Sequence, residues 1–209
     1  MRKVNIKTLV LGMVQNNCYI VGDRESKEVV VIDPGDDVYK IEKYLKDNDL
    51  ECKAIFLTHG HFDHISAVAE LKGLTDAPVY AHEAETELLS NPELNASALV
   101  GGEVSLQQDI MIKDKDVFNI AGLSWQVIHT PGHTQGGVCY HLLEHGMIFT
   151  GDTIFYESVG RTDFPTGNQN TLTESIHNQL MVLADNIELY PGHGRPTTIG
   201  HERQNNPYL

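Results

Sequence analysis

The chain has little of several features that would define a protein class at once. No apolar stretch approaches the ~20 residues that a helix needs to span a bilayer, so a membrane protein is not expected. Only three residues, Cys18, Cys52 and Cys139, are cysteines, too few for a complete disulfide framework. Each lies in an apolar, strand-like segment, where a small buried thiol is the usual explanation. We therefore expect a reducing, cytoplasmic location.

Basic residues are also scarce. The sequence has 15 Lys and Arg against 29 Asp and Glu, which gives a formal net charge of −14. Such a surface repels phosphate backbones, and no basic stripe with interleaved aromatic residues is present. An acidic excess of this kind is typical of a well-solvated surface. Nucleic acid and membranes are therefore not expected partners, and a nuclease is disfavoured.

The chain shows no internal division. Proline, glycine and serine are scattered, no segment has low complexity, and no repeat at a solenoid period is visible. Residues 1–209 are therefore predicted to form a single domain. The N-terminus begins with Met1-Arg2-Lys3, but Asn5 and Lys7 interrupt the apolar run that follows, so we expect a first strand rather than a signal peptide.

Apolar, β-branched runs alternate with amphipathic stretches along the chain, and these predict strands and helices respectively. Strands are expected at residues 3–11, 18–22, 28–32, 54–57, around 79–80, and at 116–120, 123–129, 137–142, 147–150 and 188–190. Helices are expected at residues 36–46, from 63 through 71, at 83–89 and at 171–184. Two strand-rich halves with helices outside indicate an α/β fold in which two sheets pack face to face beneath helices.

One stretch does not fit this pattern. Residues 91–108 are polar and weakly periodic and include Gly101-Gly102. They are expected to form an exposed loop, with a lid beside a functional site as the alternative.

The most informative feature is a set of seven potential metal ligands, most of them beside glycine. The motif T-H-G-H-F-D-H is followed by T-P-G-H-T, T-G-D-T and Y-P-G-H-G. The seven side chains are those of His59, His61, Asp63, His64, His133, Asp152 and His193.

Their chemistry and spacing predict a two-metal site. Imidazole and carboxylate suit Zn²⁺, Mn²⁺ and Fe²⁺, and two ions ~3.5–4 Å apart need about three ligands each plus a shared one. The first motif lies between a predicted strand and a predicted helix. His59 and His61 can then reach one metal, while Asp63 and His64 point to the other.

These motifs are familiar, and the chain resembles the metallo-β-lactamase-fold superfamily over nearly its full length. It looks most like short-form glyoxalase II (hydroxyacylglutathione hydrolase) relatives, because of T-G-D-T-I-F, V-G-R-T-D-F and the ending P-G-H-G-R-P-T-T-I-G. The resemblance implies a four-layer αββα sandwich of two mixed sheets. It also implies that His59, His61 and His133 hold one divalent ion and that Asp63, His64 and His193 hold the other. Asp152 would bridge the two ions, which are expected to be Zn, with Fe or Mn possible.

The resemblance further implies thioester hydrolysis, for example of S-lactoylglutathione, by a metal-bridging hydroxide. The departing thiolate, with a pKa near ~8.5, needs little help from a general acid. Asp63 is expected to orient the hydroxide as well as to ligate. Arg161 is expected to contact a substrate carboxylate, with a pairing to Asp163 as the alternative. Asp152 stands where zinc β-lactamases usually carry cysteine, which disfavours antibiotic hydrolysis.

The resemblance is weakest in the segments that are expected to determine substrate specificity. Short-form relatives often carry an arginine-glycine pair where this chain has Tyr156-Glu157, and only residues 197–209 follow the last ligand, without the helical extension that helps long forms bind glutathione. The acyl group and thiol carrier therefore stay open. A mononuclear Fe(II) persulfide dioxygenase, whose family shares the G-R-T-D-F element, is the alternative activity.

The remaining histidines are expected to have surface or packing roles. His201 is expected near the site through the C-terminal tail. The others are His82, His129, His141, His145 and His177.

Overall fold

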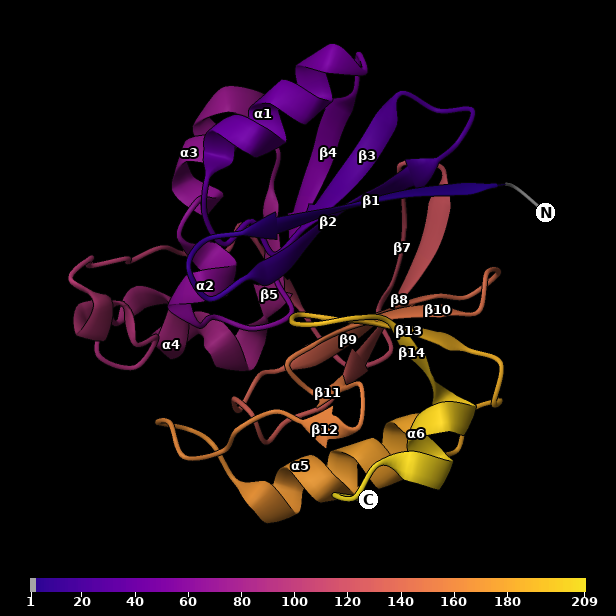
Figure 1. Ribbon diagram of the computed structural model, residues 1–209. Coiled ribbons are helices and arrows are strands. Elements are labelled where there is room, and N and C mark those ends of the chain that lie inside the picture. Colours follow the sequence, from indigo (N-terminus) through magenta and orange to yellow (C-terminus); the bar gives the residue numbers. More distant parts are fainter. Residues whose placement is uncertain (1–2) are drawn as a thin grey trace.

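Two six-stranded mixed sheets pack face to face in the computed structural model, which describes residues 3–209 (Figure 1). The first sheet has the order β1-β2-β3-β4-β5-β6, antiparallel from β1 to β3 and parallel from β3 to β6. Its strands are β1 (Val4–Leu11), β2 (Asn16–Asp23), β3 (Glu28–Ile32), β4 (Glu51–Phe56), β5 (Val79–His82) and β6 (Ile110–Ile112).

The second sheet has the order β14-β13-β10-β9-β8-β7, with one parallel pair, β10 and β13. Its strands are β7 (Val117–Ile120), β8 (Leu123–His129), β9 (Val138–Leu142), β10 (Met147–Gly151), β13 (Glu188–Pro191) and β14 (Thr197–Thr198). A separate hairpin of β11 (Ile154–Phe155) and β12 (Ser158–Val159) follows β10.

Helices cover both outer faces (Figure 1). Helices α1 (Val38–Asp47) and α3 (Val68–Thr75) pack on the first sheet. Helix α5 (Gln169–Ser175), its π-helical continuation η3 (Ile176–Leu180) and α6 (Ile199–Asn205) pack on the second. The remaining helical turns are α2 (Phe62–Ile65), η1 (Glu83–Glu85), α4 (Thr86–Ser90) and η2 (Ser97–Val100). The predicted four-layer αββα sandwich of two mixed sheets is confirmed.

The layers follow from the period-two alternation of side chains along each strand. In β3, Val30 and Ile32 point into the core between the sheets, while Val29 and Val31 point toward the helices. Both sets are buried, which explains why β3 is apolar at every position after Glu28 rather than alternating. Trp125 is fully buried between the sheets, and Phe118 packs at the edge of the same core.

Several elements differ from the sequence prediction. The helix expected from residue 63 through 71 is two helices, α2 and α3, and the helix expected at 171–184 starts at Gln169 and ends at Leu180. The short strands β6, β11, β12 and β14 and the polar helix α6 were not expected. Strands of two or three residues are too short to show a recognisable period. Helix α6 was missed because Gly200, a poor helix former, lies in its first turn. Thr198 caps this turn, since its hydroxyl accepts a hydrogen bond from the His201 amide.

Residues 91–108 form a folded segment with buried polar contacts. Asn95 is fully buried, and its side chain donates to the Val104 carbonyl over 2.8 Å. The Asn95 carbonyl accepts from the Phe62 amide, within the H-x-H-F-D-H motif, over 2.9 Å. The segment is thus tied to the predicted metal-binding loop.

All three cysteines are free and buried, as predicted. Within residues 3–209, none of the helices has the length and apolar character to cross a membrane. Residues 1 and 2, at the start of the rejected signal segment, lie outside the described residues. The single domain over residues 1–209 stays a prediction.

Candidate metal centre

The seven candidate ligands come together at one end of the two sheets, each from a segment that follows a strand. His59 follows β4, and His61, Asp63 and His64 lie at or inside the first turn of α2. The other three follow β8, β10 and β13 and are His133, Asp152 and His193. An isolated bridge between Asn16 and His193 joins the two sheets beside them.

A first group of three side chains could hold a metal ion. His59, His61 and His133 each offer a nitrogen, and these atoms lie within 4.8 Å of one another. His133 Nε2 is 2.9 Å from His61 Nδ1 and 3.2 Å from His59 Nε2. Three imidazole nitrogens converging on one point match the N-rich donor sets that zinc and iron prefer.

Asp63, His64 and His193 make up a second group that could hold an ion. His193 Nε2 lies 3.1 Å and His64 Nε2 3.6 Å from Asp63 Oδ2. Asp152 stands between the two groups. Its Oδ1 faces His64 Nε2 at 3.4 Å, and its Oδ2 lies 3.7 Å from His133 Nε2 and 3.6 Å from His193 Nε2. This position suits a carboxylate shared by two ions.

Contacts on the far side of three rings hold the proton of the neutral imidazole on Nδ1. His133 donates from Nδ1 to the Arg161 carbonyl over 2.7 Å. His64 donates from Nδ1 to Asp33 Oδ2 over 2.9 Å. Thr58 Oγ1 donates to the same oxygen over 2.6 Å and therefore accepts from His59 Nδ1 at 3.1 Å. In the neutral form of each ring Nε2 therefore carries the lone pair that a metal ligand requires.

The pKa values of the histidines in the site shift in opposite directions. Burial, reinforced by neighbouring histidines, lowers the pKa of His61 to about 3 and that of His59 well below its usual range. Burial alone would lower the pKa of His64 too, but Asp63, Asp152 and Asp33 raise it well above normal. The Asp152 pKa is lowered because His64, His133 and His193 outweigh the opposite effect of burial. The carboxylates thus require positive charge, which protons or divalent ions can supply.

A fit to metal ions is supported by buried polar atoms that lack partners. Within the described residues, His64 Nε2 and Asp152 Oδ1 are buried without a hydrogen bond, and the two atoms face each other at 3.4 Å. Such orphan atoms are rare unless a ligand satisfies them. Gly192 leaves room beside them, since a Cβ there would overlap Asp152 Oδ1. The donor set and its surroundings therefore fit divalent cations.

A cleft of about 510 Å³ opens over five of the seven side chains, those of His61, Asp63, His133, Asp152 and His193. Its lining combines candidate ligands with an apolar wall that includes Phe62, Phe155 and Phe164. Arg161 also lines the cleft, but its guanidinium holds Asp163 with two hydrogen bonds of 2.7 and 2.8 Å and stacks on Phe164. The alternative pairing with Asp163 is therefore present, and contact of Arg161 with substrate stays a prediction.

Sequence reasoning missed two carboxylates that hold the site. Asp33 accepts from the Thr58 amide, from the Thr58 hydroxyl and from His64, so one carboxylate supports both groups. Its signal in the sequence is an aspartate directly after the apolar run Val29–Ile32 of β3. Glu85 is fully buried and accepts from the amides of Gly60 and Gly136, over 2.8 and 2.7 Å. It lies in a run of acidic residues that is typical of a solvated helix, and only the fold shows which one is buried.

Two histidine contacts lie outside the cleft. His82 stacks on His129 with ring centroids 4.1 Å apart, which fits the predicted packing role. His201 stacks on Tyr156 and lies 3.0 Å from Glu157, without lining the cleft.

Comparison with known proteins places the chain in a family. The model of the metallo-beta-lactamase superfamily matches residues 11–193, so the chain belongs to that superfamily, whose members are generally metal-dependent hydrolases. Probable metallo-hydrolase YqgX of Bacillus subtilis is 36% identical over 205 residues, covering 97% of this chain and 96% of the relative. Hydroxyacylglutathione hydrolase GloC of Haemophilus influenzae is 34% identical over 209 residues, covering 99% and 98%.

Solved structures agree with the fold. The crystal structure of the BLEG-1 B3 metallo-beta-lactamase superposes with a TM-score of 0.93 at 38% identity, covering 98% of this chain and 99% of that one. TTHA1623 in a di-iron-bound form gives 0.85 at 34% identity, covering 97% and 100%. ETHE1 from Myxococcus xanthus gives 0.81 at 28%, covering 97% and 83%.

Proposed function

We propose that this protein is a binuclear metallohydrolase that cleaves thioesters of small thiols. The observation that carries the proposal is the meeting of two three-residue groups at Asp152, where the buried atoms His64 Nε2 and Asp152 Oδ1 lack a hydrogen bond. The di-iron form of a relative at 34% identity supports a two-metal site of this kind.

In this proposal the seven side chains divide as their geometry suggests. His59, His61 and His133 hold one ion, the second is held by Asp63, His64 and His193, and Asp152 is shared. The ions, when bound, supply a water acidified toward pKa ~7 and a Lewis acid for the substrate carbonyl. We propose Zn²⁺ as the resident metal, with Fe²⁺ or Mn²⁺ as alternatives, since imidazole and carboxylate suit all three.

The chain's own groups would orient the reactants. Asp63 Oδ2 faces His193, and the other oxygen of this carboxylate is the group we assign to accepting a hydrogen bond from the attacking water. The apolar wall of Phe62, Phe155 and Phe164 excludes solvent from the substrate. A dry environment strengthens the attraction between the site and the charge that develops on the carbonyl oxygen.

The choice of a thioester rests on the leaving group. Apart from candidate metal ligands, the only titratable side chain in the described lining of the cleft is Arg161, which stays protonated. No separate general acid is therefore available to protonate a poor leaving group. A thiolate, with a pKa near ~8.5, departs without one. The similarity to GloC, named as a hydroxyacylglutathione hydrolase, supports the same substrate class.

The proposal is tested by loading metal-free protein with Zn²⁺, Fe²⁺ or Mn²⁺ and following thioester cleavage by the thiol released. Glutathione and N-acetylcysteamine thioesters with lactoyl and longer acyl groups make up the panel. We expect turnover that the Asp152→Ala variant abolishes together with part of the bound metal. A loaded, folded protein that cleaves none of these thioesters would contradict the proposal.

Two other activities belong in the same screen. Two of the candidate groups, His59–His64–Asp152 and Asp63–His64–His193, are sets of two histidines and one carboxylate, the ligand type of mononuclear Fe(II) oxygenases. Oxygen uptake on glutathione persulfide with one iron per chain would favour the dioxygenase. The similarity to BLEG-1 makes a β-lactam a necessary third substrate, although Asp152 replaces the expected cysteine.

The proposal also includes a cytoplasmic location and small-molecule substrates rather than nucleic acid. The three free, buried thiols support a reducing compartment, and the net charge of −14 disfavours phosphate backbones.

A further inference from the structure

A second, apolar groove opens beside the candidate metal cleft. It has a volume of about 250 Å³ and lies between the turn that joins β1 to β2, the start of α2 and the end of η2. Its apolar lining includes Leu11, Met13, Val14, Phe62 and Val100. Residues 91–108 thus contribute to it through Val100.

Several of these apolar side chains are held open to solvent. Met13 is 95% exposed, Val100 55% and Val14 48%. Three of the thirteen exposed large hydrophobic side chains among the described residues therefore line one groove. Single exposed apolar residues are common on protein surfaces, but a group of them in one groove is not. Such a grouping is typical of surfaces that bind an apolar partner.

The groove is continuous with the cleft that is lined by five of the candidate ligands. Val14, Phe62 and Asp63 line both. Phe62 stands between two candidate ligands in the H-x-H-F-D-H motif, and its amide is held by the Asn95 carbonyl. A molecule with its reacting carbon near Asp63 would therefore extend directly into the groove.

The charges along this path are of one sign. The charged residues lining the groove are Asp36 and Asp63, and the described lining contains no Lys, Arg or His. In the cleft the lining cation other than candidate ligands is Arg161, which is held by Asp163. A substrate carboxylate that entered the groove would meet like charge and no partner, which costs more than it gains.

We propose that this groove binds the hydrocarbon part of the substrate, so that the protein prefers thioesters with an extended, uncharged apolar chain over those with carboxylates near the reacting carbon. This inference rests on the proposed thioester hydrolysis. The chain can belong to the acyl group or to the thiol, because the chemistry of the groove is the same for both. Met13, Val14 and Val100 are the residues that determine the preference.

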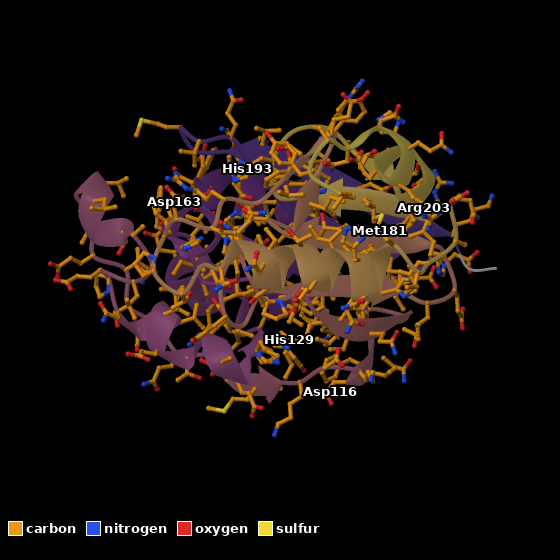
Figure 2. The ribbon with its side chains drawn as sticks, turned by 90° about the horizontal axis from the view of Figure 1, so that it is seen from below. Asp116, His129, Asp163, Met181, His193 and Arg203 are labelled. Atoms are coloured by element: carbon orange, nitrogen blue, oxygen red, sulfur yellow. The ribbon has the colours of Figure 1, made fainter. Side chains whose placement is uncertain are left out.

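The variant Met13→Ser/Val100→Ser tests the groove, because both side chains are exposed and their replacement leaves the core intact. Val182→Ser is the matched control, since Val182 is 70% exposed and lines neither the groove nor the cleft. It follows Met181, which Figure 2 shows toward the opposite end of the view from Asp163 and His193.

The first measurement compares kcat/KM for butanoyl and octanoyl thioesters of N-acetylcysteamine, and uses the uncleavable thioether S-octyl-N-acetylcysteamine as a binding probe in calorimetry. We expect wild type and V182S to prefer the octanoyl thioester. In the double variant, the ratio of kcat/KM for the octanoyl thioester to that for the butanoyl thioester should fall about tenfold. The variant should also bind the uncleavable thioether about tenfold more weakly. Tenfold is the low end of the range for contacts in an apolar pocket. Equal kcat/KM for the two chain lengths, or equal thioether affinity in all three proteins, would overturn the inference.

Charge is tested with Asp36→Asn, which removes a lining charge at an exposed position. We expect its KM for octanoyl-glutathione to fall about two- to fivefold, the range for exposed charges, with the N-acetylcysteamine thioester unchanged. No change for either substrate would refute the charge argument.

Failure of this inference differs visibly from failure of the proposed function. If no thioester is cleaved, the proposed function is wrong. The affinity for the uncleavable thioether then decides whether the groove binds a hydrocarbon chain. Analytical ultracentrifugation compares the oligomeric states of the wild type and M13S/V100S. If the variant changes the oligomeric state but not the affinity for the thioether, the groove is an interface between copies of the chain and the inference is wrong.

Discussion

Replacing Asp33 by asparagine should remove one candidate metal site and leave the other. Asp33 offers Oδ1 to the Thr58 amide at 2.8 Å and Oδ2 to both the Thr58 hydroxyl and His64 Nδ1, at 2.6 and 2.9 Å. With the amide oxygen of the new asparagine kept at the Oδ1 position, its NH₂ group faces His64. The His64 ring then keeps an unsatisfied N–H or shifts its proton to Nε2, the atom that must stay free for a metal.

The substitution should affect metal binding by the first group, His59, His61 and His133, less than binding by the second. The Thr58 hydroxyl can accept a hydrogen bond from the asparagine NH₂ while it continues to accept from His59 Nδ1. His59 therefore keeps its free Nε2. His64 loses a charge-assisted partner, and such outer contacts are worth about 10- to 100-fold in metal affinity.

We therefore expect D33N to bind one ion about as tightly as wild type and the second about 10- to 100-fold more weakly. In the metal-free protein the unfolding free energy should fall by about 1–3 kcal/mol, the cost of leaving a buried group unsatisfied. Metal titration followed by calorimetry and elemental analysis measures the first effect, and urea unfolding the second.

The matched control is Asp76→Asn. Asp33 and Asp76 both have positive φ angles, 50° and 60°, which asparagine tolerates, but Asp76 lies exposed at the end of α3. D76N should match wild type in both assays. If D33N bound both ions with wild-type affinities, the assignment of Asp33 as the residue that fixes His64 would be refuted.

Three further outcomes follow from other contacts. Gly192→Ala should lower metal content and turnover at least tenfold, because the new Cβ would overlap Asp152 Oδ1. Gly73→Ala, with nothing within 4 Å, should leave activity unchanged and stabilise α3 by ~0.5–1 kcal/mol, and a loss of activity in that control would undermine the comparison. His82 has a pKa lowered to about 4 by burial and by His129, so the folded state keeps it neutral where the unfolded chain binds a proton. Its contribution to stability is complete above pH ~6.5 and is lost as pH falls toward about 4, so His82→Asn should lose less unfolding free energy between pH 7.5 and 4.5 than wild type; an equal loss in both proteins would argue against this origin.

Much of the fold follows from local patterns in the sequence. The run Val29–Ile32 is apolar at every position because its strand is covered on both faces, and the amphipathic stretch at α1 places Ile41 and Leu45 on the inner face. Such patterns predict the sandwich because burial depends on side-chain period. The strands that were missed have only two or three residues, such as β11 and β14, which is too short for a repeating pattern to show, so tertiary hydrogen bonds decide their conformation.

The site, like the fold, has some residues that could be recognised from local sequence patterns and others that could not. The seven candidate ligands could be recognised because ligands cluster after strands, beside glycines that allow close approach, as at Gly192. Asp33 and Glu85 could not be assigned, because their roles depend on which distant amides and rings the fold brings to them. Likewise, the contribution of Val100 to the groove depends on how residues 91–108 fold over Phe62, which no periodicity encodes.

The most direct test of the two-metal thioesterase is a titration of metal-free protein with Zn²⁺ while hydrolysis of an octanoyl thioester is followed. Because Asp152 stands between two complete groups, activity should rise until about two ions are bound per chain and should be lost when a chelator removes them. Turnover that is unchanged without metal, or that is complete with one ion per chain, would contradict the account.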